Sequence, residues 1–480
     1  MARRGARIEQ SRREVERCDQ AFRAWLARRR AADAAGQYAS QLDAVEYVMD
    51  ENLGLMRGEL EAIPLAASVP DIYGVCEKVD RQLVWVRRLW DYFREKWDQR
   101  DDPERRPVLA AADEIVWSCY APPFRQLQRP VGPAPLPYIA TEFSPHAIPR
   151  RQLPQYLRPS DELLMRALDE LPVSVVGIPQ ICIANPWWLV LIPHEVGHQV
   201  AFELDGGRLP ATVGALAADA AARAGGAALA DDEWSAWAQE LFADAFAGTM
   251  VGAAHLWALN ELETGEGEAL VQRVPGYPPP IVRRAVTAEL LRCSGLPDSE
   301  ALPAVPAAPA LEELKIGGAD RERVERQLGA VGAVAQALAE EPIVEKSSLR
   351  ELLPLRVDQV SRSGRSGQWR KELAGAAEAR PEPLLEAARL ATAGALAEWA
   401  ETMAEPDQER RLARTDRLRQ RMLEVVPNCR EPGKRAAREG AGAGIAELAR
   451  ELAREANALP LEEPVWSAEP APTPDGVWVA

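Results

Sequence analysis

The sequence predicts a mainly α-helical protein with a small β element. Alanine and leucine, which favour helices, are frequent along the 480 residues. Apolar residues recur at helical spacing before residue 120, and residues 319–458 are again rich in Ala, Leu, Glu and Arg. The β-branched runs VSVVGI and ICIA, at 173–178 and 181–184, favour strands. With roughly 100 to 200 residues per domain as a guide, the chain should divide into about three domains.

The composition is that of a globular chain, with 47% hydrophobic and 27% charged residues. The formal charge of -16 argues against nonspecific nucleic-acid binding, so protein or peptide partners are expected. The six cysteines form no Cys-x-x-Cys pair, which indicates neither a disulfide framework nor a cysteine zinc site. This pattern and the lack of an apolar signal-peptide core near the first residue favour a cytoplasmic location.

Residues 1–121 are expected to form an N-terminal helical domain. Prolines then become dense, so residues 122–170 are expected to be an extended, Pro-rich connection without regular helix. Its one histidine, His146, is expected to be an exposed loop residue. The helical pattern of the first domain is clearest in one apolar stripe: Leu42, Val45, Met49, Leu53, Met56 and Leu60.

Residues 171–300 are expected to form a central domain. Its first 23 residues, 171–193, carry no charge over a length that could span a bilayer, but four regularly spaced prolines would break a membrane helix. We therefore expect buried strands, then a core helix, and no membrane span. Asn185 and Pro186 suit the N-cap and first position of that helix.

A second helix is expected to begin near Asp231 and Asp232 and to run through WSAWAQELFADAFAG. Residues 301–318, which contain LPAVPAAPA, are expected to be a linker. Residues 319–460 should form a C-terminal helical domain, in which Ser348 and Glu351 have the spacing of a capping box. Residues 461–480 have the composition of a disordered tail.

One motif in the central domain is typical of a metal site. Residues 194–198 read His-Glu-Val-Gly-His, which places His194 and His198 one turn apart on the same helix face. Both imidazoles can then reach one Zn²⁺ ion, which binds nitrogen ligands at about 2.0 to 2.1 Å. Glu195 would point toward the open coordination position.

A zinc peptidase needs a third protein ligand, and its place in the sequence separates the known patterns. The metzincin pattern needs Gly and His three and six residues after the second ligand, where this chain has Ala201 and Leu204. A later glutamate is the alternative, and Glu240 begins the segment Glu-Leu-Phe-Ala-Asp. Asp244, one turn further, can accept a hydrogen bond from a ligating histidine.

These two motifs resemble those of the gluzincin metallopeptidases, and within them the family of CAAX-prenyl proteases and heat-shock membrane proteases. HEVGH and ELFAD are similar to that family's H-E-x-x-H and E-x-x-A-D, and Gly248 follows shortly after. The family commonly continues with His-Pro-Pro and an arginine six residues after this histidine. Here Tyr277 replaces the histidine, and Pro278, Pro279, Pro280 and Arg283 complete the arrangement.

The resemblance covers residues 173–295 and implies a zincin-like metallopeptidase core, flanked by helical domains and without the family's membrane spans. It implies zinc as the cofactor and a part for Tyr277 and Arg283 in stabilising the oxyanion. A loop-anchoring role for these two residues is the alternative. The flanking helices could bind protein partners.

The residues themselves indicate hydrolysis of a peptide bond by a zinc-activated water, with Glu195 as the general base. The β-branched runs could supply an edge strand for the substrate. The alternative is a noncatalytic helical interaction scaffold with a structural zinc site, although such a site needs no base. A membrane-embedded protease is disfavoured by the four prolines.

Four further residues are expected to be structural. His255 lies eleven residues after Asp244, about 16 Å away on a continuous helix, so it should not reach the metal. Cys182, Trp187 and Trp188 are expected in the core.

Overall fold

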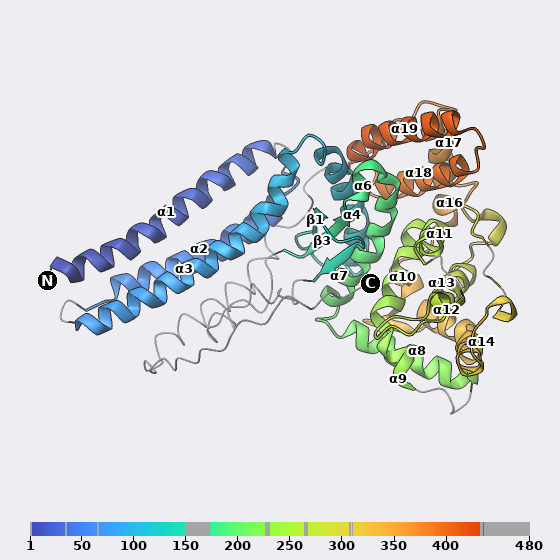
Figure 1. Ribbon diagram of the computed structural model, residues 1–480, viewed down its shortest axis with the longest axis horizontal. Coiled ribbons are helices and arrows are strands. Elements are labelled where there is room, and N and C mark those ends of the chain that lie inside the picture. Colours follow the sequence, from blue (N-terminus) through green and yellow to red (C-terminus); the bar gives the residue numbers. More distant parts are fainter. Residues whose placement is uncertain are drawn as a thin grey trace.

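The computed structural model describes residues 2–33, 36–64, 67–149, 173–225, 231–263, 267–306, 309, 311–432 and 435. In this part of the chain the fold is mainly helical with two small sheets, as predicted. An elongated three-helix bundle projects from a larger helical body (Figure 1). No described helix is both long enough and apolar enough to cross a membrane.

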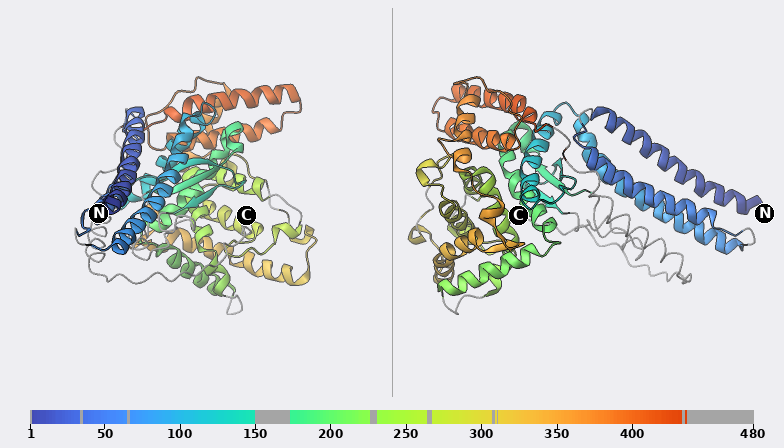
Figure 2. Two further views of the ribbon diagram at one scale, coloured as in Figure 1. Left: turned by 60° about the vertical axis from the view of Figure 1, so that its left-hand side comes forward. Right: turned by 180° about the vertical axis from the view of Figure 1, so that it is seen from behind.

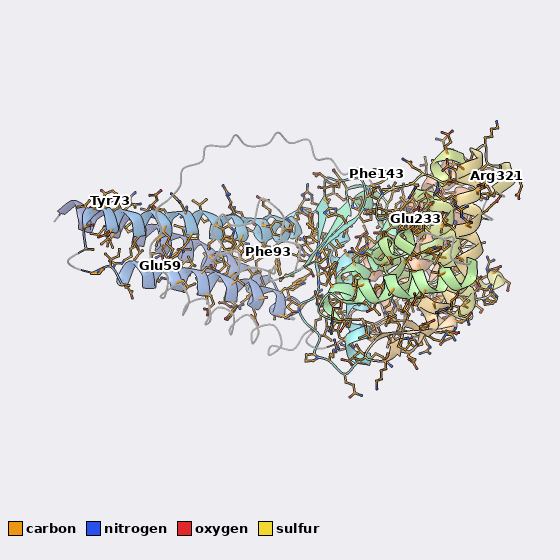
Figure 3. The ribbon with its side chains drawn as sticks, turned by 90° about the horizontal axis from the view of Figure 1, so that it is seen from below. Glu59, Tyr73, Phe93, Phe143, Glu233 and Arg321 are labelled. Carbon is orange, nitrogen blue, oxygen red and sulfur yellow. The ribbon has the colours of Figure 1, made fainter. Side chains whose placement is uncertain are left out.

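The projecting bundle, which we call the arm, consists of α1 (Ala2–Ala32), α2 (Ala39–Glu61) and α3 (Val69–Asp98). It has its own buried cluster, which includes the aromatic residues Phe22, Trp25 and Phe93. The apolar stripe predicted on α2 is buried in this cluster. Tyr73 lies toward the far end of the arm and Phe93 nearer the body (Figure 3).

The next helix, α4 (Arg106–Gln126), belongs to the body and crosses the predicted boundary at residue 121. The prediction that no regular helix follows this boundary is wrong, because Pro122 and Pro123 lie inside the last turns of α4. Pro122 has no N–H to donate to the Ser118 carbonyl, and the side chain of Arg389 donates to that oxygen instead. The short helix η1 (Gln99–Asp101) joins α3 to α4.

A three-stranded sheet lies between the arm and the body (Figure 2). Its order is β1 (Leu136–Ala140), β3 (Val175–Pro179), β2 (His146–Ile148), with β1 parallel and β2 antiparallel to β3. Alternate residues of β3 face opposite sides: Val175 packs in the arm cluster and Val176 in the body. The predicted Pro-rich connection therefore contains two strands, and its residues 150–170 lie outside the described residues.

Only the first β-branched run forms a strand. VSVVGI supplies the first four residues of β3, as predicted, but ICIA forms the short helix α6 (Ile181–Ala184). A four-residue apolar run fits a strand or a helical turn equally, and here the Asn185 N–H closes the turn on the Ile181 carbonyl. Asn185 precedes a 3-10 helix, η3 (Pro186–Leu191), and its side chain makes no capping hydrogen bond. The expectation that Asn185 caps the HEVGH helix is thus wrong.

The HEVGH helix is α7 (Ile192–Glu203), and the Glu240 helix is α10 (Ala238–Val251). The second predicted helix begins at Asp231, as expected, but it is interrupted at Trp237 and ends at Gly252. The other helices around these two are α8 (Leu209–Gly225), α9 (Asp231–Ala236), α11 (Ala253–Leu262), α12 (Gly267–Leu270) and α13 (Pro280–Cys293).

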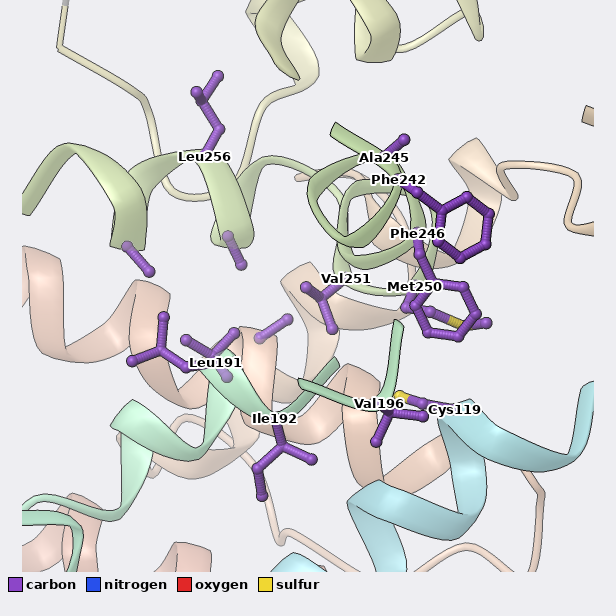
Figure 4. Packing of buried hydrophobic residues seen from close by; sticks show 14 of the residues in the cluster. Cys119, Leu191, Ile192, Val196, Phe242, Ala245, Phe246, Met250, Val251 and Leu256 are labelled. Carbon is purple, nitrogen blue, oxygen red and sulfur yellow. The ribbon is translucent and has the colours of Figure 1, made fainter. Parts of the chain in front are cut away.

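The described C-terminal helices share one buried cluster with the central region, and no separate core divides them. Figure 4 shows part of this cluster, with Val196 of α7, Cys119 of α4 and Phe246 of α10. The capping box of Ser348 and Glu351 is confirmed, whereas residues 436–460 and the predicted tail at 461–480 lie outside the described residues. The elements of this region are η4 (Asp298–Glu300), η5 (Leu311–Glu313), α14 (Gly318–Glu340), β4 (Pro342–Val344), β5 (Ser347–Ser348), α15 (Leu349–Leu352), α16 (Val357–Val360), α17 (Arg365–Ala374), α18 (Ala387–Met403), α19 (Gln408–Val425) and η6 (Val426–Asn428).

Candidate metal centre

The two helices that carry the predicted ligands cross in close contact. Gly197, between the two histidines of α7, faces the backbone of α10. A Cβ atom at this position would lie 3.0 Å from Ala243 Cα and 3.3 Å from Phe246 Cβ. The glycine therefore lets the two helix axes approach closely enough for side chains on both to meet.

The three predicted ligands lie together at this crossing. His194 Nε2 is 3.1 Å from His198 Nε2 and 3.3 Å from Glu240 Oε2, and His198 Nε2 is 3.4 Å from Glu240 Oε1. Ligands about 2.0 to 2.1 Å from a tetrahedral ion are separated from one another by about 3.3 Å. The nitrogen atoms and the two Glu240 oxygens therefore have the spacing expected around a bound Zn²⁺, and the three residues could hold a metal ion.

Asp244 orients the first of these ligands. Its Oδ1 lies 2.8 Å from His194 Nδ1, so it can accept the proton of that nitrogen and leave Nε2 free for a metal. Burial alone would raise the pKa of Asp244, but the charges of Arg283 and His194 outweigh burial and hold this pKa well below its usual value. The carboxylate is therefore ionised at neutral pH.

Glu195 is 5% exposed and lines a cavity that also contains the three ligands. Burial raises the pKa of Glu195 to about 7, although the charge of His194 opposes this effect. A carboxylate that gains and loses a proton near neutral pH suits a general base. Glu195 is not part of either residue group whose geometry could hold a metal.

Arg283, in the first turn of α13, reaches into the ligand set. Its Nη2 lies 3.1 Å from Glu240 Oε2, and its Nε and Nη2 lie 2.6 and 2.9 Å from the two carboxylate oxygens of Asp244. Its Nη1 donates to Glu263 Oε1 at 3.1 Å. Tyr277 lies in the turn before α13, is 44% exposed and lines the same cavity. The structure thus places both of these sequence candidates at the site.

The cavity has a volume of about 290 Å³ and two kinds of wall. Leu191, Phe202, Leu259 and Leu262 provide apolar surface. Residues 144–147 and Pro149, from β2 and its flanking turns, also line the cavity. Strand β2 is at an edge of the described sheet, because it pairs only with β3.

His146 is not the exposed loop residue that the sequence predicted. It lies in β2, half-buried, with its Nε2 2.8 Å from the Tyr138 hydroxyl. Tyr138, Gly177 and His146 occupy one row across the three strands. A Cβ atom on Gly177 would come within 2.2 Å of the His146 ring, so the glycine makes room for the imidazole.

His255 is close to the site, contrary to the distance expected for a continuous helix. Its Nε2 lies 3.0 Å from Asp244 Oδ1, and its ring stacks on that of His194 with centroids 5.7 Å apart. The chain turns back because Gly252, between α10 and α11, adopts φ +62° and ψ −142°. Gly252 is visible in the sequence, but helical periodicity alone did not reveal that the helix breaks after Val251.

No family model, curated protein or solved structure matches this chain. The arrangement of side chains at the α7–α10 crossing is therefore the basis for assigning a function. The remaining residues expected to be structural lie near this crossing without joining it. Cys182 and Trp187 are buried, and Trp188 is half-buried, with both tryptophan rings packed against Trp399 of α18.

Proposed function

We propose that the chain is a zinc-dependent endopeptidase with a zincin-like core, in which His194, His198 and Glu240 hold the metal. The observation that carries the proposal is the convergence of the two histidine Nε2 atoms, 3.1 Å apart, with one Glu240 oxygen 3.3 Å from the first and the other 3.4 Å from the second, beside a cavity that Glu195 also lines. A structural zinc site closes its coordination with protein ligands, whereas a catalytic site keeps one position open. Three ligands, an open side and a buried carboxylate favour catalysis over the scaffold alternative.

When bound, zinc would polarise a water molecule and the scissile carbonyl. Glu195 would take the proton of this water and later deliver it to the leaving amine. The products are a carboxylate and an amine, with one water consumed and no covalent intermediate. Asp244 would keep His194 in the tautomer that offers Nε2 to the metal.

The oxyanion would be stabilised by Tyr277, Arg283 or both. The Tyr277 hydroxyl can donate a hydrogen bond, and the partly exposed side chain can approach a substrate. Arg283 carries its positive charge within 3.1 Å of Glu240, next to the ligand set. The guanidinium is already fixed by Asp244 and Glu263, so little reorganisation would be needed during the reaction.

We infer that the substrate is a protein or peptide in an extended conformation. An extended chain can pair with β2, which is an edge strand among the described residues and forms one wall of the cavity. The apolar wall formed by Leu191, Phe202 and Leu259 would then receive an apolar side chain. The projecting arm is the surface that we propose for protein partners.

A cytoplasmic location is also part of the proposal. All six cysteines lie among the described residues, and none is in a disulfide. Five of them are buried, so they behave as small apolar residues. The proposed partners and cofactor include no nucleic acid and no membrane.

The test is cleavage of a diverse peptide library by the full chain with Zn²⁺, by the same protein after chelation, and by Glu195→Gln. The amide of glutamine keeps the shape of the side chain but cannot take the proton of water. Cleavage by the zinc-loaded wild type alone supports the proposal. Cleavage by Glu195→Gln at the wild-type rate would exclude Glu195 as the base, and a zinc-loaded wild type that cleaves nothing would favour the scaffold.

A further inference from the structure

Asp244 contacts three side chains, although one contact would be enough to orient the proposed metal ligand His194. Besides His194, its carboxylate binds Arg283 through both oxygens and His255 through Oδ1. Asp244 is 3% exposed, so water does not compete for these bonds. Its position is therefore set jointly by α7, α11 and α13, which carry the three partners.

His255 makes one side-chain hydrogen bond, to Asp244, through one of its two ring nitrogens. Its Nε2 lies 3.0 Å from Asp244 Oδ1, and its Nδ1 has no hydrogen-bond partner in the part of the chain that the structure describes. Because the carboxylate only accepts hydrogen bonds, Nε2 must carry the proton. The side chain is fully buried, with 0% exposed, so the bond to Asp244 is what compensates for burying its polar ring.

The ring of His255 also supports His194 directly. The two imidazoles are nearly parallel, with an angle of 21° between their planes and 5.7 Å between their centroids. His194 is therefore held at Nδ1 by Asp244 and against one face by His255. Rotation of the His194 ring, which would turn Nε2 away from His198 and Glu240, is opposed by both contacts.

A metal site made by His194, Asp244 and His255 themselves is the competing interpretation, since these three residues also lie within ligand distance of one another. Two observations argue against it. The guanidinium of Arg283 donates to both oxygens of Asp244 at 2.6 and 2.9 Å, which is closer than its 3.1 Å approach to Glu240 Oε2, so a cation held by Asp244 would have to displace the tighter ion pair. Asp244 is not among the residues that line the cavity, whereas all three ligands of the proposed site are.

We propose that His255 is a positioning residue for the metal centre, which fixes Asp244 by a hydrogen bond and the His194 ring by stacking. The inference rests on the proposed function only through the metal site, because His255 lies outside the proposed ligand set and acts through Asp244 and His194. Its effect should therefore appear in metal affinity, whether or not the chain cleaves a peptide.

The experiment measures the Zn²⁺ affinity of the purified full chain by competition with a chromogenic chelator. His255→Phe keeps an aromatic ring against His194 but removes the donor, and His255→Gln places an amide N–H near the position of Nε2. Partners of metal ligands typically contribute 10- to 100-fold in affinity, and His255 acts one bond further away, so the expected loss in His255→Phe is about 10-fold. His255→Gln should stay within about 3-fold of the wild type, because the hydrogen bond to Asp244 is restored.

Thr249→Val is the matched control, because Thr249 is buried in α10 and donates only to the Phe246 carbonyl. It can change stability without changing the metal centre, so its zinc affinity should equal that of the wild type. Co²⁺-loaded protein provides a second readout, since the absorption bands of the ion report ligand geometry. These bands should shift in His255→Phe and stay unchanged in Thr249→Val.

Equal zinc affinity in wild type and His255→Phe would overturn the inference, because this variant keeps the ring and lacks only the hydrogen bond to Asp244. If His255→Phe does not fold, His255→Asn, which is too short to reach Asp244, replaces it in the comparison with His255→Gln. A wild type that binds no zinc would refute the proposed metal centre and this inference together. A wild type that binds zinc beside an unaffected His255→Phe would refute this inference alone.

Discussion

Replacement of Asp244 by alanine should weaken the metal centre and also destabilise the fold. Asp244 Oδ1 lies 2.8 Å from His194 Nδ1, and the carboxylate binds Arg283 at 2.6 and 2.9 Å. Loss of the first contact frees the His194 ring to change its tautomer and orientation. Loss of the second leaves a guanidinium whose side chain is only 12% exposed without its main partner.

The two effects have different sizes. Loss of the hydrogen bond to a metal ligand should weaken zinc binding by about 10- to 100-fold, which is about 1.4 to 2.7 kcal/mol. Removal of one partner from a buried ion pair typically costs about 3 to 5 kcal/mol. The lower end, about 3 kcal/mol, is expected here because Glu240 and Glu263 each remain 3.1 Å from the guanidinium.

Chelator competition measures the zinc affinity of Asp244→Ala, and urea denaturation of the metal-free protein measures its free energy of unfolding. Asp205→Ala is the control, because Asp205 pairs with the exposed Arg208 and should contribute at most about 1 kcal/mol. The double variant Asp244→Ala/Arg283→Met should recover most of the stability and none of the zinc affinity. Wild-type zinc affinity in Asp244→Ala would show that Asp244 does not orient His194. An unrecovered stability in the double variant would show that the buried charge is not the cause.

Three further predictions follow from single positions. Gly252→Ala should lower the free energy of unfolding by about 1 to 3 kcal/mol and weaken zinc binding. The backbone angle φ of +62° is unfavourable for alanine, and a Cβ atom would lie 2.8 Å from Val360 Cβ. Unchanged results in urea denaturation and chelator competition would contradict this prediction. Gly177→Ala should cost about 1 to 3 kcal/mol in urea denaturation, because its Cβ would meet the His146 ring at 2.2 Å, and the cost should largely disappear in a His146→Ala background. Burial lowers the pKa of Lys96 to about 8, below its value of about 10.4 in an unfolded chain. Between pH 8 and about 10.4 the unfolded state therefore binds more protons than the folded state, so the free energy of unfolding should rise with pH in this range. In Lys96→Met this rise should be absent, and equal pH profiles of unfolding for the two proteins would show that burial of the ammonium is not what sets this pKa.

The ligand set could be predicted because each part of it depends on local spacing. His194 and His198 share a helix face by periodicity alone, as do Glu240 and Asp244. The strand β3 was predictable from its β-branched run. The zinc motif then indicated that α7 and α10 must meet, and Gly197 at the point of contact explains why they can.

The other parts of the site depend on where the chain turns. His255 reaches Asp244 only because Gly252 ends α10, and a helical pattern that continues on both sides of a glycine does not show such a break. Strand β2 has three residues in a proline-dense stretch, too few for alternation to be recognised, although it forms a wall of the cavity. Arg283 was predicted only by resemblance, since its contact with Asp244 joins residues 39 positions apart.

The extent of the body was also hidden from the sequence. A change of composition at residues 301–318 suggested a linker, but the helices after it are buried in the same cluster as α4, α7 and α10. Trp399 of α18, for example, stacks on Trp187, only seven residues before His194. Long-range packing of this kind leaves no periodic signal in the sequence, because each helix appears amphipathic whichever partner it has.

The metal content of the purified chain tests the central claim most directly. Elemental analysis of the wild type should find one zinc per chain, and His198→Ala and Glu240→Ala should lose it, because each removes one of the three proposed ligands. The His146→Ala variant is the control. It should retain the metal, because His146 lies at the cavity wall outside the ligand set. Full zinc occupancy in both His198→Ala and Glu240→Ala, or a loss in His146→Ala as large as theirs, would contradict the account.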